Sequence, residues 1–318
     1  MKRIKLSVYL DRMIEDYKKR ESYSSAHICA AVKRSIFTYY GADHELYMGD
    51  VTPQFLTGYE HWLTVTKKCS WNTSSLYIRF IRIACNRALE DGNVKHIPNL
   101  FKHVFTHVTR NHERALLPKE MRMLITPDAA DAPAGSGAPK RRSPRRPILK
   151  AALYLELLVR LQGISFRDLA TLRKADVHGD YIVFRRQKTG VEVHIRLTES
   201  VRNLLGRCKA DPDSPFLLNL LDSTLTGEAL YNNYCRALRN MNYYLKKLAL
   251  LRGVCRKVSS YCARHTWATV AKDQKIPLLV IAECLGHTSA TTTEAYLKAS
   301  DNNCLDAANA TVVKHILG

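Results

Sequence analysis

The chain has 318 residues and a formal net charge of +20 at pH 7, and this length fits two domains of ordinary size. Hydrophobic residues make up 46% of the sequence, which is enough for a packed core and excludes wholesale disorder. A positive surplus of this size favours a polyanionic partner, above all nucleic acid, because Lys and Arg gain affinity by displacing counterions from phosphates. A basic surface that is simply solvated is the alternative.

The cysteines and the apolar stretches limit the compartment and the cofactors. Nine cysteines are scattered along the chain without a Cys-x-x-Cys pair, which disfavours a zinc ribbon or a thioredoxin-like site and favours free thiols in a reducing compartment. Residues 1–10 are basic and lack the apolar core of a signal peptide, and no stretch approaches the ~20 apolar residues of a membrane span. We expect a cytoplasmic protein that needs no metal, no cofactor and no membrane.

Residues 1–110 are predicted to form a helical domain. Thr52 is expected to cap a helix that has Pro53 at its first position, and Asn72 or Thr73 is expected to cap the next helix. That next helix has a cationic face, on which two residues are predicted to contact DNA: Arg79 and Arg82.

Residues 111–147 are predicted to be a flexible basic linker. From 127 onward the segment is rich in Pro, Gly, Ala and Ser and almost lacks large apolar residues. The basic residues expected to bind DNA here are Lys140, Arg141, Arg142, Arg145 and Arg146. The segment is interpreted as a solvated linker, as a strap along the DNA backbone, or as both; a nuclear localisation signal is a third interpretation that depends on charge alone.

Residues 148–318 are predicted to form a second domain, mostly helical. Two short strands, 181–186 and 192–197, show alternating hydrophobicity and are joined by a tight turn that contains Lys188. Helices are expected on both sides of this hairpin, the last of them over 301–317. The predicted fold class is therefore mainly α with a small antiparallel β-hairpin or sheet (α+β).

Chemistry is expected in three segments of this second domain. They are the turn with Lys188, the run Tyr261-Cys-Ala-Arg264-His265, and Leu-Gly-His287, with Tyr296 nine residues after the last histidine. Each segment alone is more typical of a structural role. Together, and in this order, they resemble the tyrosine recombinase (phage integrase) family over residues of about 150 to 300, and residues 20–95, including the Asn-Thr step, resemble that family's helical core-binding domain.

The resemblance implies a role for each matching residue. Tyr296 is the nucleophile, Arg264 binds phosphoryl oxygens with its planar fork, and Lys188 is the acid for the leaving 5′ oxygen. His287 donates a hydrogen bond to a phosphoryl oxygen, and His265 supports Arg264. The chemistry is consistent, because a phosphodiester is anionic and its attack requires cations where charge builds up. A 3′-phosphotyrosine keeps the bond energy, so the DNA ends are rejoined without ATP.

Two positions depart from the common pattern of the family. Ser165 stands where its first catalytic arginine is expected, and Tyr261 where its box begins with histidine. Both changes resemble a bacterial subgroup of mobile-element integrases and DNA invertases. Loss of one oriented donor commonly costs ~3 kcal/mol of transition-state stabilisation, so another cation is expected to compensate, with Arg160, Arg167 and the linker arginines 142–146 as open candidates. Asp168 is expected either to hold Arg264 or the hairpin, or to be a helix-surface acid.

The resemblance also implies partners: double-stranded DNA, and a homotetramer on synapsed DNA sites formed from a free monomer. The amphipathic tail after Tyr296 is expected to dock on a neighbouring protomer or on its own domain. Two alternatives stay open, a catalytically impaired DNA-binding relative and a type IB topoisomerase. The target sequence, and the choice between integration, excision and inversion, cannot be read from one chain.

Overall fold

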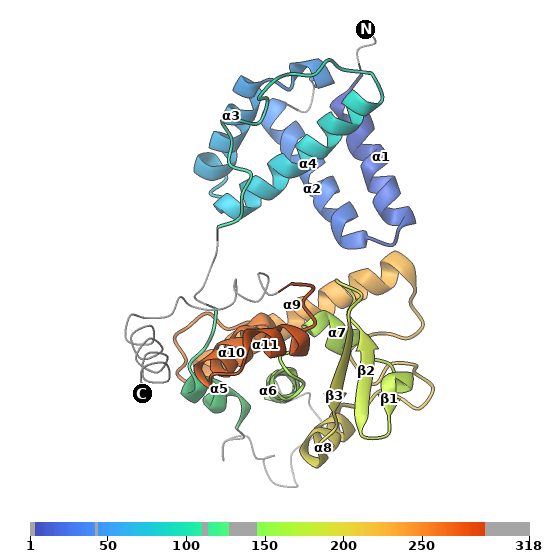
Figure 1. Cartoon of the computed structure of the whole chain (residues 1–318), viewed down its shortest axis with the longest axis vertical. Helices are drawn as coiled ribbons and strands as arrows, with labels where there is room; N and C mark the ends of the chain where they lie inside the picture. Colours follow the sequence, from blue (N-terminus) through green and yellow to red (C-terminus); the bar gives the residue numbers. More distant parts are fainter. Residues whose placement is uncertain (1–3, 42–43, 110–113, 127–144, 290–318) are drawn as a thin grey trace, which may run out of the picture. The chain divides into compact units, whose positions relative to one another are not determined.

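The computed structural model describes residues 4–41, 44–109, 114–126 and 145–289 (Figure 1). The chain divides into two compact units, residues 1–110 and 111–318, and each unit has its own hydrophobic core. Helices dominate the described part of the chain, and its strands form a three-stranded antiparallel sheet. The predicted mainly α fold with a small antiparallel sheet is therefore confirmed.

The first unit is a bundle of helices. Its elements are α1 (Leu6–Lys19), α2 (Tyr23–Tyr40), the 3₁₀ turn η1 (Met48–Asp50), α3 (Pro53–His61), the π-helical turn η2 (Trp62–Thr66) and α4 (Trp71–Glu90). The start of α3 confirms the predicted cap, because the Thr52 side chain accepts a hydrogen bond from the backbone nitrogen of Phe55 at 3.1 Å and Pro53 follows it. This cap fixes where α3 begins, and Leu56 and Tyr59 of this helix are buried in the core.

The predicted cap of α4 is wrong by two or three residues. Ser70, in extended conformation, accepts a hydrogen bond from the backbone nitrogen of Thr73 at 3.2 Å and begins the helix. Asn72 instead exchanges two hydrogen bonds with the backbone of Thr109, its Oδ1 accepting at 2.8 Å and its Nδ2 donating at 3.0 Å. The asparagine therefore fastens the chain that leaves the first unit, and the cap passes to the serine before it.

The second unit surrounds helix α6 (Arg145–Arg160), whose residues Leu155, Leu157 and Leu158 are fully buried. Helices α5, α8, α9 and α10 pack against α6. The elements are α5 (Pro118–Ile125), α7 (Phe166–Thr171), the 3₁₀ turn η4 (Lys174–Asp176), β1 (Val177–His178), β2 (Tyr181–Arg185), β3 (Glu192–Arg196), α8 (Glu199–Cys208), α9 (Gly227–Leu251), α10 (Ser260–Asp273) and α11 (Leu278–Cys284). None of the described helices has the length and apolar character needed to cross a membrane.

The sheet has the order β1-β2-β3, with both pairs antiparallel. In the register Ile182 pairs with Ile195 and Phe184 with Val193, and all four side chains are buried against the core. A backbone hydrogen bond of 2.9 Å from Arg186 to Val191 closes the turn that carries Lys188. The two predicted strands are confirmed, whereas the two-residue β1 is too short to show a sequence pattern.

The linker prediction is wrong for part of residues 111–147. Pro118–Ile125 form α5, because proline at the first helical position and Glu120, whose carboxylate accepts from the nitrogen of Leu117, favour a helix start. Met121 and Leu124 of α5 are buried in the core of the second unit. Helix α6 also begins within the predicted linker, at Arg145. Residues 127–144 and the predicted helix 301–317 lie outside the described residues.

Candidate active site

Three of the predicted catalytic residues that the structure describes gather around the end of α11: Arg264, His287 and Lys188. Arg264 on α10 and His287 just after α11 are joined directly by a hydrogen bond of 2.9 Å. The hairpin with Lys188 reaches the same place, because Thr189 donates to the carbonyl of Gly286 at 3.2 Å. Tyr296 lies outside the described residues.

Arg264 is the centre of this site and is 2% exposed. Its Nη1 donates to the carbonyl of Gly163 at 2.9 Å, and its Nη2 donates to the carbonyl of Leu285. Gly163 has a φ of +65°, and a Cβ there would lie 3.2 Å from the Cα of Arg264, so the turn before α7 approaches α10 closely. One guanidinium thus ties α10 to the loop before α7 and to the end of α11.

The Leu-Gly-His segment is the C-terminal cap of α11, which lies beside α10 (Figure 1). The nitrogens of Gly286 and His287 donate to the carbonyls of Glu283 and Ala282 at 2.8 and 2.9 Å, with Gly286 in the left-handed region at a φ of +59°. A Cβ on Gly286 would overlap the Cδ of Arg186. The glycine is therefore required both by the cap and by the arginine side chain that crosses it.

Ser165 is the N-cap of α7 and carries no charge into the site. Its hydroxyl accepts from the nitrogen of Asp168 at 3.2 Å and donates to the Oδ2 of that carboxylate at 2.7 Å. Asp168 is 2% exposed, so it is not a surface acid. Its Oδ1 accepts from the nitrogen of Gln187 at 2.9 Å and its Oδ2 from the Nε of Arg186 at 3.2 Å. Of its two expected roles, holding Arg264 or holding the hairpin, the carboxylate takes the second.

Arg186 is the residue at this site that sequence reasoning missed. It is 8% exposed, and its Nη1 donates to the carbonyls of Leu285 at 2.8 Å and Gly286 at 3.0 Å. The sequence held a signal, because Ile182 and Phe184 face the core and the period of two in a strand places residue 186 on the same side. Arg186 was overlooked because it stands in a basic run with Arg185, which is exposed, and Lys188, so the sequence did not mark it as different from a surface arginine.

Among the arginines proposed from sequence to replace the missing cation, those with described side chains make no contact with this cluster: Arg146, Arg160 and Arg167. Arg160 is 43% exposed and bonds Glu156 at 2.7 Å and Ser200 at 3.3 Å. Arg167 makes no hydrogen bond or ion pair through its side chain to any described residue of the site. Of the linker arginines, 142 lies outside the described residues and Arg146, in the first turn of α6, is exposed.

Two further predicted residues stack on α10. The rings of Tyr261 and His265 are 4.9 Å apart and nearly perpendicular, and the guanidinium of Arg114 lies 5.8 Å above the tyrosine ring. His265 is buried. Its neighbour Thr266 accepts a hydrogen bond from the nitrogen of Leu116 at 2.9 Å, so this part of α10 holds the chain that enters the second unit.

The electrostatics of the site are dominated by positive charge. Burial, followed by the charges of Arg264, Arg186 and Lys188, lowers the pKa of His287 to about 3. The imidazole is therefore neutral at pH 7. Because a guanidinium only donates, the Nε2 of His287 accepts from Arg264 and the ring proton is on Nδ1. Three cations around a neutral, half-buried histidine form a site suited to an anion. In the described part of the chain, no group of three His, Cys, Asp or Glu residues is placed to hold a metal ion.

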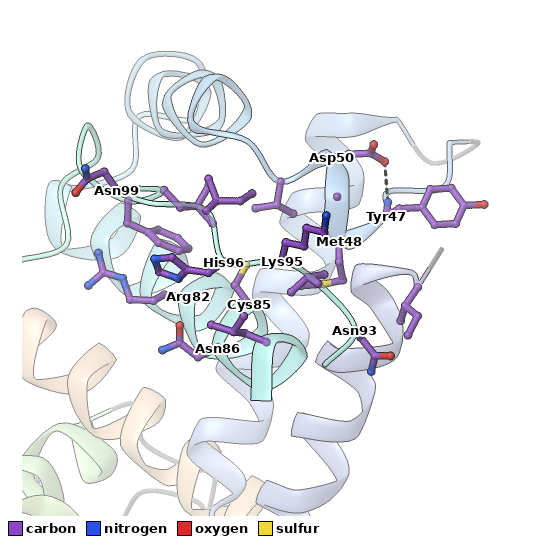
Figure 2. Close-up of a pocket in the computed structure, with 18 of the residues that line it drawn as sticks. Tyr47, Met48, Asp50, Arg82, Cys85, Asn86, Asn93, Lys95, His96 and Asn99 are labelled. Carbon is purple, nitrogen blue, oxygen red and sulfur yellow. Dashed lines mark hydrogen bonds between the residues drawn. The ribbon is translucent and has the colours of Figure 1, made fainter. Parts of the chain in front are cut away.

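The predicted DNA-binding arginines of the first unit make contacts within their own domain. The Nε of Arg79 lies 3.4 Å from the carbonyl of Ser75. The guanidinium of Arg82 lies 4.7 Å above the ring of Phe101 and lines a pocket of about 730 Å³ together with Lys95 and His96 (Figure 2). Of the basic residues predicted at the linker, Arg145 and Arg146 belong to α6, while Lys140, Arg141 and Arg142 lie outside the described residues.

Comparison with known proteins identifies the family. Residues 5–104 match the phage integrase SAM-like domain and residues 148–303 match the phage integrase family. No curated protein matches the chain. The fold is similar to that of a lambda integrase tetramer bound to a Holliday junction, with a TM-score of 0.64, 16% identity, and 94% of this chain and 80% of that chain covered.

Two other solved structures share the fold. The Tn1549 transposon integrase in complex with transposon right end DNA has a TM-score of 0.64 and 14% identity, with 99% of this chain and 100% of that chain covered. The XerH site-specific recombinase bound to difH substrate has a TM-score of 0.53 and 14% identity, with 81% of this chain and 70% of that chain covered. The two family matches together span most of the chain, which therefore belongs to the phage integrase family and is a tyrosine recombinase, an enzyme of site-specific DNA recombination.

Proposed function

We propose that this recombinase breaks and rejoins DNA through a 3′-phosphotyrosine on Tyr296. The observation that carries the proposal is the joining of Arg264, His287 and the Lys188 hairpin at the end of α11. These three residues match the residue types that the family has at its catalytic positions, and the proposed nucleophile follows nine residues after His287 in the sequence.

The proposed reaction is a transesterification. The phenolic oxygen of Tyr296 attacks the scissile phosphorus, the bond from phosphorus to the 5′ oxygen breaks, and the phenolic proton passes to solvent. Lys188, exposed at the hairpin tip, gives a proton to the leaving 5′ oxygen. Rejoining is the reverse reaction, in which a 5′ hydroxyl attacks the phosphotyrosine and Tyr296 leaves.

Arg264 and His287 stabilise the phosphoryl oxygens in this proposal. The guanidinium of Arg264 places a buried positive charge where negative charge develops in the transition state. The hydrogen bond from Arg264 occupies Nε2 of His287 in the absence of DNA. An entering phosphate competes for that donor, and its negative charge favours protonation of the imidazole, so that Nε2 becomes a donor to a phosphoryl oxygen.

We propose double-stranded DNA as the partner and a tetramer on synapsed sites as the active assembly. The net charge of +20 supports a polyanionic partner. The lambda integrase neighbours are a dimer bound to a core site and a tetramer bound to a Holliday junction. Ser165 and Tyr261 support placement in the mobile-element subgroup, and the Tn1549 transposon integrase is a structural neighbour of that kind.

The experiment that tests the function selects its own DNA substrate. The full chain is incubated with a pool of duplexes that carry a random segment and a nick. Cleavage close to the nick releases a short strand that bears the new 5′ hydroxyl, and loss of this strand prevents rejoining and traps the enzyme on DNA. We expect covalent adducts that survive detergent with the wild type and none with Tyr296→Phe, which still retains DNA on a filter.

The alternatives predict other results in the same experiment. A catalytically impaired relative retains DNA on the filter and forms no adduct, which would contradict the proposal. A type IB topoisomerase relaxes supercoiled plasmid that lacks the selected sequence as fast as plasmid that contains it. Site-specific recombination predicts that only the plasmid with the selected sequence is cut.

A further inference from the structure

We propose that Arg186 contacts the scissile phosphate and supplies the cation that is missing at Ser165. The inference rests on the proposed function and names an additional residue for it. The family's first arginine belongs to the start of α7, where Ser165 and Asp168 only bond each other and the hairpin. Arg186 comes from a different element, directly after β2, and bonds Oδ2 of Asp168, the same oxygen that accepts the Ser165 hydroxyl.

Arg186 lies directly beside Arg264. Both guanidinium groups donate to the same carbonyl oxygen, that of Leu285, Arg264 through Nη2 and Arg186 through Nη1 at 2.8 Å. Their donor nitrogens are thus separated by no more than about two hydrogen-bond lengths. Arg186 is also among the charges that lower the pKa of His287. A second arginine is therefore present beside Arg264 even though the first arginine of the family pattern is absent.

The free edge of this guanidinium is suited to a ligand. Nε bonds Asp168 and Nη1 bonds two carbonyls, while Nη2 donates to no acceptor among the described residues. Contacts at Nε and Nη1 hold the planar group in one orientation, and the remaining amino group is available to a phosphoryl oxygen.

The charge balance of the cluster favours an anion. Arg186, Arg264 and Lys188 carry three positive charges, and Asp168 contributes one negative charge, so the cluster is positive overall. Two buried guanidinium groups this close repel each other in the absence of a ligand. A phosphate between them offsets that repulsion. The transition state carries additional negative charge, so the two guanidinium groups stabilise it more than they stabilise the bound substrate.

The absence of a side chain at Gly286 leaves room for the side chain of Arg186. A Cβ at that position would overlap the Cδ of Arg186 and lie 3.2 Å from its Cγ. The arginine stem therefore crosses directly over the glycine of the Leu-Gly-His segment. The position of the guanidinium is fixed by the same residues that place His287.

The test uses duplexes recovered by the wild type in the covalent selection, made with the scissile phosphate either normal or replaced by a methylphosphonate. The methyl group removes the negative charge of one nonbridging oxygen. We expect Arg186→Ala to lower the rate of adduct formation about a hundredfold on the phosphate, as for loss of one oriented donor. On the methylphosphonate, the difference from the wild type should fall to less than about tenfold, because the missing positive charge is no longer needed.

Matched variants separate this role from a structural one. Arg185→Ala removes the adjacent guanidinium, which is 74% exposed and pairs with Glu192, and is expected to cleave both substrates at the wild-type rate, as are Arg160→Ala and Arg167→Ala. Arg186→Lys is expected to keep more activity than Arg186→Ala on the phosphate. Retention of DNA on a filter checks that each variant is folded.

Each result decides the inference. Equal losses by Arg186→Ala on both substrates would assign Arg186 a purely structural role and overturn it. Wild-type cleavage by Arg186→Ala, with Tyr296→Phe inactive, would overturn it and leave the proposed function intact. Absence of any wild-type adduct would overturn the proposed function itself, and this inference with it.

Discussion

Replacement of Gly286 by alanine tests the packing at the centre of the site. The φ of Gly286 is +59°, and an added methyl group would overlap the Cδ of Arg186 and lie 2.7 Å from the Cγ2 of Val193. Real carbon atoms do not approach so closely, so the end of α11, the arginine or strand β3 must move. The carbonyl of Leu285 accepts from both buried arginines and the carbonyl of Gly286 accepts from Arg186, so movement of these carbonyls disturbs the cationic cluster.

The magnitude follows from two separable costs. A left-handed φ costs an L-residue about 1–2 kcal/mol, partly offset by about 0.4–1 kcal/mol because alanine restricts the unfolded chain. Overpacking of a filled site adds about 1–3 kcal/mol. Gly179 is the matched control, because its φ is +58° and an added Cβ would meet nothing within 4 Å. We expect Gly179→Ala to lower the free energy of unfolding by about 1 kcal/mol or less, and Gly286→Ala by about 2–4 kcal/mol.

The assay combines denaturant unfolding of both variants with adduct formation on the selected duplex. Gly286→Ala is expected to lose about a hundredfold in cleavage rate, since an oriented donor to the phosphate is displaced, while Gly179→Ala cleaves at the wild-type rate. Equal stability of the two variants, together with normal cleavage by Gly286→Ala, would show that the arginine stem does not pack on the glycine and would refute the reasoning.

Three further predictions concern the pKa of His287, a helix cap and the thiols. Burial and the cations of Arg264, Arg186 and Lys188 lower the pKa of His287 to about 3, so its imidazole should stay neutral from pH 5 to 8 in nitrogen NMR spectra; titration near the ordinary value of about 6.5 would contradict this. Between these two pKa values the histidine is protonated in the unfolded chain and neutral in the folded one. His287 should therefore lower the free energy of unfolding as the pH falls from about 6.5 towards about 3. Thr52→Ala should cost the first unit about 1 kcal/mol in denaturant unfolding, whereas Thr57→Ala should cost less, because that hydroxyl bonds the carbonyls of Pro53 and Gln54, next to its own helical turn; equal losses would exclude the cap. Burial raises the pKa of Cys29 to about 11 and of Cys85 to about 12, so peptide mass spectrometry at pH 8 should find exposed Cys255 modified first and those two only after unfolding; early labelling of Cys85 would show that its helix opens.

The sequence predicted the elements where local chemistry decides structure. Thr52 before Pro53 began α3 as expected, because a cap and a fixed φ act within one turn. The alternation of residues 181–186 and 192–197 gave both strands of the hairpin. Prediction was wrong where two local signals compete. Ser70 and Asn72 are both good caps, and the contact between Asn72 and distant Thr109 decided which of them begins α4.

The family could be predicted because the residue types and order of its sequence motifs are specific, although each of these side chains alone indicates little. The sequence could not show that Arg264 and His287 are joined or that α5 packs on the second core, since both depend on residues far apart in the chain. Helix α5 also has only eight residues, which is too short for a clear helical repeat of apolar residues, and it precedes a segment rich in proline and glycine.

The sequence by itself determined that this chain carries a tyrosine, an arginine, a lysine and a histidine in the order of a recombinase, and that its first arginine position holds Ser165. Only the tertiary structure decided where the other buried cation lies. The acceptors that hold Arg186 come from Asp168, Leu285 and Gly286. A buried guanidinium is stable only where such acceptors converge, and packing of α7, the hairpin and α11 brings them together.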